Sequence, residues 1–140
     1  MDYEGRNDGA GAEDVERNGS GGEKQLARMF RRHGIRYRYE YPVALIERGK
    51  VRVWYPDFWL PAYGVAVDYA GLMDKAEYAR GMAYRHLVYV ENDVAHVYVS
   101  PADMTGYWPK RILEAIAVEA EARFEKVHEL RRAILDGKYG

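Results

Sequence analysis

Two aspartates, Asp57 and Asp68, have the residue type and the spacing to hold a divalent cation between them. They lie in two apolar and aromatic runs, 51–60 and 65–70, and the segment 61–64 between the runs has the composition of a tight turn. If the ends of this turn pair, cross-strand partners have numbers that sum to 125, and Asp57 lies opposite Asp68 with Cβ atoms about 5 Å apart. Carboxylates that close repel each other unless they share a proton or a cation, and a hard ion such as Mg²⁺ is the simpler expectation.

The residues around the two acids resemble the motif of the PD-(D/E)XK nuclease superfamily, which has the restriction-endonuclease-like fold. Pro56 and Asp57 match its Pro-Asp pair, and Asp68 matches the second acid, but Ala70 stands where the strand usually carries a lysine. A subset of the superfamily instead places a basic residue on the following helix, ahead of x-x-x-Tyr. Arg85, which precedes Tyr89, matches that migrated position, and the resemblance covers roughly residues 20–116.

This resemblance implies metal-dependent hydrolysis of phosphodiester bonds in DNA, with Mg²⁺ as the cofactor and Mn²⁺ as its substitute. It implies that Asp57, Asp68 and the backbone carbonyl of Tyr69 hold the ion or ions. It further implies that Glu23 helps to place the attacking water and that Arg85 supports the charge on the phosphate. The implied partner is DNA, and the implied class of enzyme is an endodeoxyribonuclease.

Other interpretations of these residues stay open. Glu23 is also explained as the glutamate of an N-terminal capping box that begins at Ser20. Lys75 competes with Arg85 for the task of the missing lysine. An arginine cannot act as a base at neutral pH, although it can stabilise charge in a transition state. The alternative function is therefore a catalytically impaired nuclease-fold module that binds nucleic acid or a partner protein, and a protein-interaction module that uses the C-terminal helix is a third class.

Composition limits the remaining possibilities. The 140 residues can form one core, and the absence of cysteine excludes disulfides, zinc-thiolate sites and cysteine nucleophiles. The four histidines show no ligand spacing. We find neither an apolar run of about 20 residues nor a signal-peptide pattern, so we expect a cytoplasmic protein without a membrane partner. Residues 23–52 carry nine bases against three acids, which is compatible with a phosphate-facing surface or with an ordinary solvated one.

The pattern along the chain predicts an α/β domain. We expect a disordered acidic, Gly-rich tail over residues 1–19 and a nuclease-like domain over residues 20–140. Within it we expect a helix at 20–33, strands at 35–47, 51–60 and 65–70, a capped helix at 74–91, a fourth strand at 94–99 parallel to the third, and a C-terminal helix at 107–136. This αβββαβ order is the core order of the restriction-endonuclease-like fold, a mixed four-stranded sheet flanked by helices. The C-terminal helix is longer than so small a core can cover, which favours a homodimer contact along it.

Overall fold

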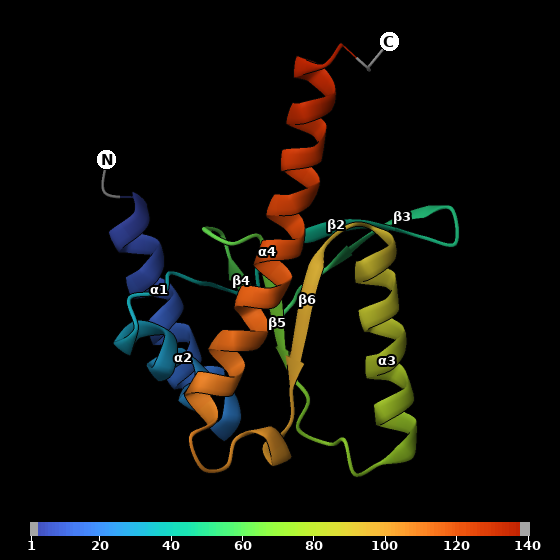
Figure 1. The fold of residues 1–140 in the computed structure, drawn as a ribbon. Coiled ribbons are helices and arrows are strands. Elements are labelled where there is room, and N and C mark those ends of the chain that lie inside the picture. The colour runs from blue at the N-terminus through green and yellow to red at the C-terminus, as the bar shows by residue number, and fades with distance from the viewer. Residues whose placement is uncertain (1–2, 138–140) are drawn as a thin grey trace.

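The computed structural model describes residues 3–137, with side chains from residue 11 onward. In chain order the elements are α1 (Tyr3–Asn18), α2 (Gly21–Arg32), β1 (Arg38–Tyr39), β2 (Val43–Glu47), β3 (Lys50–Trp54), β4 (Phe58–Leu60), β5 (Val65–Tyr69), α3 (Ala76–Glu91), β6 (Ala95–Val99), the short 3₁₀ helix η1 (Pro101–Asp103) and α4 (Trp108–Leu135) (Figure 1). The mixed α/β class and the long C-terminal helix are thus confirmed. Residues 1–2 of the predicted tail and residues 138–140 of the predicted domain lie outside the described part.

A four-stranded mixed sheet positions the two aspartates, since Asp68 lies in β5 and Asp57 directly precedes β4. Its strand order is β1-β4-β5-β6, with β4 antiparallel to β1 and β5, and with β6 parallel to β5. The β4–β5 register pairs Phe58 with Val67 and Leu60 with Val65, which confirms the predicted sum of 125. Gly64 closes the turn with φ +67°, a left-handed conformation that glycine adopts without strain.

Two of the predicted strands are wrong as single strands, because each is broken beside a proline. The strand expected at 35–47 divides into β1 and β2 around Pro42, and the strand expected at 51–60 divides into β3 and β4 around Pro56. Proline cannot donate a ladder hydrogen bond, and Glu40 adds a left-handed backbone at φ 53°. The β2–β3 hairpin therefore leaves the main sheet and forms a two-stranded sheet of its own, which contacts α3.

The prediction of a disordered segment over residues 1–19 is wrong for the described residues of α1. Val15 is fully buried in the main core, and α1 contacts α2 and β1. Arg28 of α2 donates two hydrogen bonds of 3.0 Å each to the Glu16 carboxylate. A segment with few large apolar residues is thus ordered by partners that α2 and β1 supply, and composition alone does not reveal such partners.

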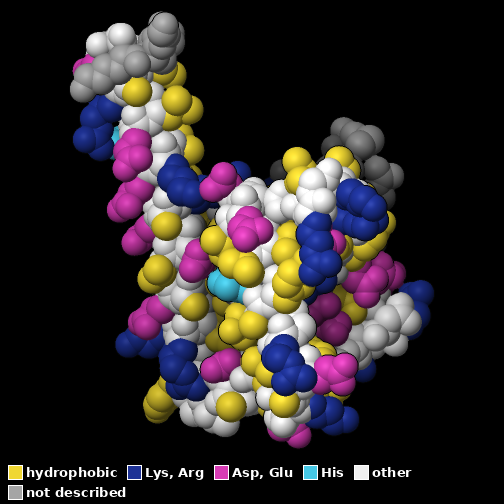
Figure 2. All heavy atoms as spheres, turned by 90° about the vertical axis from the view of Figure 1, so that its right-hand side faces the viewer, with side chains coloured by type: hydrophobic (Ala, Val, Ile, Leu, Met, Phe, Trp, Pro, Cys, Tyr) yellow, Lys and Arg dark blue, Asp and Glu magenta, His cyan; other side chains and the backbone are white. Residues whose placement is uncertain are grey.

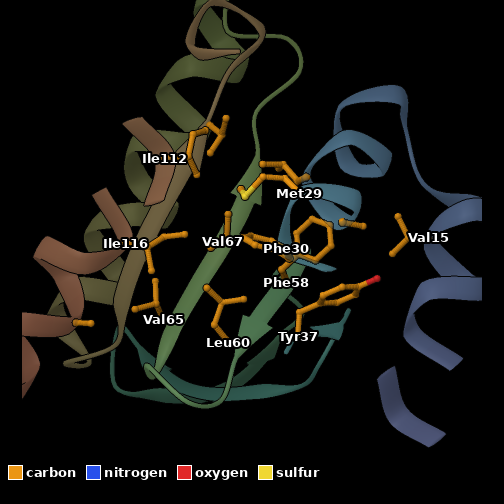
Figure 3. Close-up of a cluster of buried hydrophobic side chains, with 14 residues drawn as sticks. Val15, Met29, Phe30, Tyr37, Phe58, Leu60, Val65, Val67, Ile112 and Ile116 are labelled. Carbon is orange, nitrogen blue, oxygen red and sulfur yellow. The ribbon is translucent and has the colours of Figure 1, made fainter. Parts of the chain in front are cut away.

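The main core lies between the sheet and a layer made of α2 and α4. Figure 3 shows Val65 and Val67 of β5 pointing toward Ile112 and Ile116 of α4, with Phe30 of α2 beside them. The opposite face of β5 carries Ala66 and Asp68 by strand alternation, and α3 packs on that side. The sheet is therefore covered by helices on both faces, and the candidate site residues lie on the α3 side.

Helix ends follow the sequence in one case and depart from it in another. Ser20 is the N-cap of α2 and accepts a hydrogen bond from the Glu23 N–H, as predicted. The cap predicted at residue 74 for the second helix is wrong, because the N-cap of α3 is Lys75 and it makes no side-chain cap bond. The loop before α3 thus runs one residue further than a cap at Asp74 would allow.

The C-terminal helix α4 extends well beyond the sheet. Its first half buries Ile112, Ile116 and Ala120 against the core, and its second half projects from the body of the molecule with hydrophobic side chains along it (Figure 2). Phe124 and Leu130 are more than half exposed there, at 57% and 60%. No helix within the described residues is long and apolar enough to cross a membrane.

Candidate active site

Asp57 and Asp68 lie side by side at the end of the β4–β5 hairpin. The Asp57 N–H donates to Oδ1 of Asp68 at 2.9 Å, and the Tyr69 N–H donates to Oδ2 of Asp57 at 2.7 Å. Each carboxylate is thus held by a backbone N–H at the other strand's end, which fixes the two acids relative to each other. This geometry follows from the 125 register, since Asp57 and Asp68 are the next pair beyond Phe58 and Val67.

The two carboxyl groups have opposite electrostatic environments. Burial raises the pKa of Asp57 to about 7, and the charge of Asp68 adds to the effect, while the Tyr69 N–H opposes it. Burial also disfavours the Asp68 carboxylate, but the hydrogen bond from His96 and the charge of Arg85 together hold its pKa below the usual range. Near neutral pH the pair therefore holds one firmly ionised acid and one that is about half protonated.

Arg85 of α3 is brought into direct contact with the acids. Its Nε donates to Oδ2 of Asp68 at 2.9 Å, and one terminal nitrogen donates to the Tyr89 hydroxyl at 3.2 Å. The guanidinium also lies 5.1 Å from the ring centre of Trp54 and 5.3 Å from that of Tyr89. Of the two basic candidates, Arg85 is thus the one that contacts Asp68, whereas Lys75 is exposed at the start of α3.

Glu23 lies at the edge of the site and has structural partners. Oε1 accepts a hydrogen bond of 2.7 Å from the Tyr39 hydroxyl, and the Ser20 hydroxyl lies 3.3 Å from Oε2. Its charge contributes to the raised pKa of Asp57, which places it within electrostatic reach of that carboxyl. The capping role of Ser20 and the position of Glu23 near the acids therefore hold together.

Tyr69 links the acids to the start of α2. Its ring lies so close to Gly22 that a Cβ built there would be 2.0 Å from Cζ of the ring. Glycine at this position therefore allows the end of β5 to pack against the first turn of α2, the same turn that carries Glu23.

A histidine pair is the part of the site that the sequence did not predict. His96 of β6 lies 2.8 Å through Nε2 from Oδ2 of Asp68, and its Nδ1 lies 2.9 Å from Nδ1 of His86 on α3. The His96 side chain is completely buried, and its ring stacks on that of Tyr89 with centres 4.5 Å apart. The sequence signal was present in β6, where a histidine stands among apolar residues, but its pairing with Asp68 depends on the parallel β5–β6 register.

The donor set for a metal ion is small. Among the described residues no group of three or more His, Asp or Glu side chains is arranged to hold an ion. Asp57 and Asp68 supply carboxylate oxygens at this end of the hairpin, and Tyr69, whose backbone carbonyl the sequence predicts as a third donor, directly follows Asp68. Mg²⁺ is commonly bound through one or two carboxylates, with water and phosphate oxygens completing the shell, so a set of this size fits that ion.

No protein family, no curated protein and no solved structure matches this chain. Function is therefore inferred from the geometry of the site.

Proposed function

We propose that this protein is a metal-dependent endonuclease that hydrolyses phosphodiester bonds in DNA, a restriction-endonuclease-like enzyme of the PD-(D/E)XK type. One observation carries the proposal: the carboxylates of Asp57 and Asp68 lie side by side at the hairpin end, with the Arg85 guanidinium in contact with Asp68. The resemblance of the surrounding motif makes DNA the substrate class.

Asp57 and Asp68 would hold Mg²⁺ together with the Tyr69 carbonyl. When bound, the ion would polarise the phosphate and lower the pKa of a bound water. Asp57 must be ionised to take part, and burial opposes that ionisation. A bound cation favours the ionised carboxylate that burial disfavours. Cation binding and deprotonation of Asp57 are therefore coupled.

Arg85 and Glu23 would act on either side of the ion. Arg85 is held by Asp68, Trp54 and Tyr89, so its guanidinium is already oriented to meet the charge that builds on the phosphate. Glu23 is positioned by the Tyr39 hydroxyl and supplies an acceptor for a water at the site edge. Neither role requires Arg85 to remove a proton, which arginine cannot do at neutral pH.

A second candidate function is a nuclease-fold module that binds nucleic acid without cleaving it. The observation that favours it is the ion pair between Arg85 and Asp68, 2.9 Å long, because a side-chain cation there already balances one of the two acids. In this case Asp57 would stay about half protonated near neutral pH and no ion would be needed.

A substrate panel distinguishes the two candidates. Linear, nicked, forked and four-way DNA would be incubated with the protein in Mg²⁺ and in Mn²⁺, and binding would be measured in parallel at several salt concentrations. The endonuclease predicts metal-dependent cleavage of at least one substrate. Salt-sensitive binding of every substrate without cleavage would support the binding module, and the absence of salt-sensitive binding would contradict both.

A further inference from the structure

His96 connects the candidate active site to His86 of α3. Its two ring nitrogens are both engaged, by Asp68 at 2.8 Å and by His86 at 2.9 Å, and no part of its side chain is exposed. A buried polar ring with two well-placed partners has a defined orientation, since losing either bond would leave a polar atom unsatisfied.

The partners also define which nitrogens carry protons. The Asp68 carboxylate can only accept, so Nε2 of His96 must carry a hydrogen and donate to Oδ2. In a neutral His96 ring Nδ1 is then an acceptor, and Nδ1 of His86 must be the donor. Burial and the neighbouring His96 lower the pKa of His86, which favours this neutral arrangement.

The oxygens of Asp68 are left in unequal states. Oδ2 accepts from both His96 and Arg85, so both of its lone pairs are engaged. Oδ1 accepts from the Asp57 N–H and retains one lone pair. We propose that His96 is a positioning residue for the metal site: by donating to Oδ2 it orients the Asp68 carboxylate so that Oδ1 is the oxygen offered to the cation, and His86 holds His96 in the tautomer that this task requires. The inference rests on the metal site of the proposed function, but not on cleavage.

Residues that orient a ligand commonly change metal affinity by about 10- to 100-fold when they are removed. The test is a Mn²⁺ titration of the full-length protein, in which free Mn²⁺ is followed by electron paramagnetic resonance. His96→Ala should weaken Mn²⁺ binding by at least about 10-fold. His96→Gln, whose side-chain amide can place an N–H near the position of Nε2, should restore part of that loss.

Val99→Ala is the matched control for a purely structural role. Val99 is buried in the same strand, β6, and belongs to the main core on the far face of the sheet. Val99→Ala should lower thermal stability, as we also expect for His96→Ala, and should leave Mn²⁺ affinity unchanged. Imidazole nitrogen spectra of the wild type should show His96 protonated at Nε2 and His86 protonated at Nδ1.

Equal Mn²⁺ affinity for the wild type and His96→Ala, or equal losses for His96→Ala and Val99→Ala, would overturn the positioning role. A wild type that binds no Mn²⁺ would overturn it as well, together with the metal site. If Mn²⁺ binds in a His96-dependent way and no DNA is cleaved, the positioning role stands and the endonuclease proposal fails.

Discussion

At the scale of single residues, Asp57 is the acid of this site whose pKa is raised. It is half-buried beside an ionised Asp68, and its pKa rises to about 7 for that reason. Among the described residues, the Tyr69 N–H and Arg85 favour its charged form, and their combined effect is smaller than that of burial and Asp68. Folding therefore favours the protonated form of Asp57, whereas cation binding requires the ionised form.

Unfolding measurements on Asp57→Asn test whether the pKa of Asp57 is raised in the folded protein. In the wild type the raised folded-state pKa means that stability is fully present below the unfolded pKa of about 3.8 and is lost as pH rises through about 7. The loss is at most about 4 kcal/mol, at about 1.4 kcal/mol for each unit of pKa. Asparagine removes the titration and can still accept from the Tyr69 N–H, so the wild type should lose stability relative to Asp57→Asn over this window.

Urea unfolding at several pH values measures that difference. The contributions of the histidines to the pH dependence cancel in the comparison, because both proteins contain them. The titration of Asp68 does not obscure the result, because its lowered pKa confines its effect on stability to pH values below this range. A difference between wild type and Asp57→Asn that is constant with pH would show that Asp57 is not perturbed.

Arg85 has a separable prediction. Arg85→Ala should lower the cleavage rate by about 100-fold or more, because the transition-state charge is met locally, while DNA affinity stays within about threefold since one phosphate contact among several is lost. Arg85→Lys should retain cleavage. Rate and binding assays on the same DNA check the pair; a large, equal loss of binding in both variants would assign Arg85 to substrate affinity instead.

The residue-scale site could be predicted only where it depends on local structure. Asp57 and Asp68 face each other because a four-residue turn sets the register of the two strands. Both the turn and the register follow from residues that are close together in the sequence. His96 could not be found in the same way. Its contact with Asp68 needs the helical crossover and the parallel pairing of Ala66 with His96, which form only when the whole sheet assembles.

At the scale of elements, the start of α2 packs on the end of β5 through Gly22, whereas the adjacent Gly21 has open space around it. Gly22 lies under the Tyr69 ring, where a Cβ would be 2.0 to 2.5 Å from three ring atoms, whereas a Cβ at Gly21 meets nothing within 4 Å. The helix begins at this pair, so both glycines carry the same entropic cost in principle.

Gly22→Ala should therefore destabilise the protein by about 1–3 kcal/mol, because the Tyr69 ring has to move. Gly21→Ala is the matched control and should be neutral or stabilising by up to about 1 kcal/mol. Thermal unfolding of the two variants side by side measures this. Equal effects would mean that Tyr69 does not pack on α2 as described.

The strands also show what the sequence pattern did not predict. Alternation correctly located apolar strands on both sides of Pro42 and Pro56 but gave no reason to divide them. The prolines interrupt the ladder hydrogen bonds, and Leu45 packs against Val88 and Tyr89 of α3 once the hairpin has left the main sheet. The strand breaks are thus local, whereas the position of the separate hairpin depends on a tertiary contact.

At the scale of the whole molecule, the second half of α4 has an apolar stripe that nothing in the described chain covers. Phe124, Val127, Leu130 and Ile134 fall on the helix face that continues the buried stripe of Ile112 and Ile116, and each is about half exposed or more. We propose that a second copy of the chain covers this stripe, because exposed apolar surface of this kind usually marks an interaction site.

Sedimentation or light scattering at tens of micromolar should report a dimer, and Leu130→Glu should convert it to a monomer without loss of thermal stability in the α/β body. Glu125→Lys, on an exposed neighbouring position of α4, is the control for a change of charge alone. A monomeric wild type at that concentration would contradict the dimer.

We propose above that Asp57 and Asp68 form a site for metal-dependent cleavage of DNA. The most direct test compares the wild type with Asp57→Ala in a plasmid-nicking assay in Mn²⁺, with DNA binding measured on the same preparations. The wild type should nick the plasmid only when Mn²⁺ is present, and Asp57→Ala should bind DNA to a similar extent and leave it intact. Equal background cleavage by both proteins, with unchanged binding, would contradict the claim and identify the chain as a binding module.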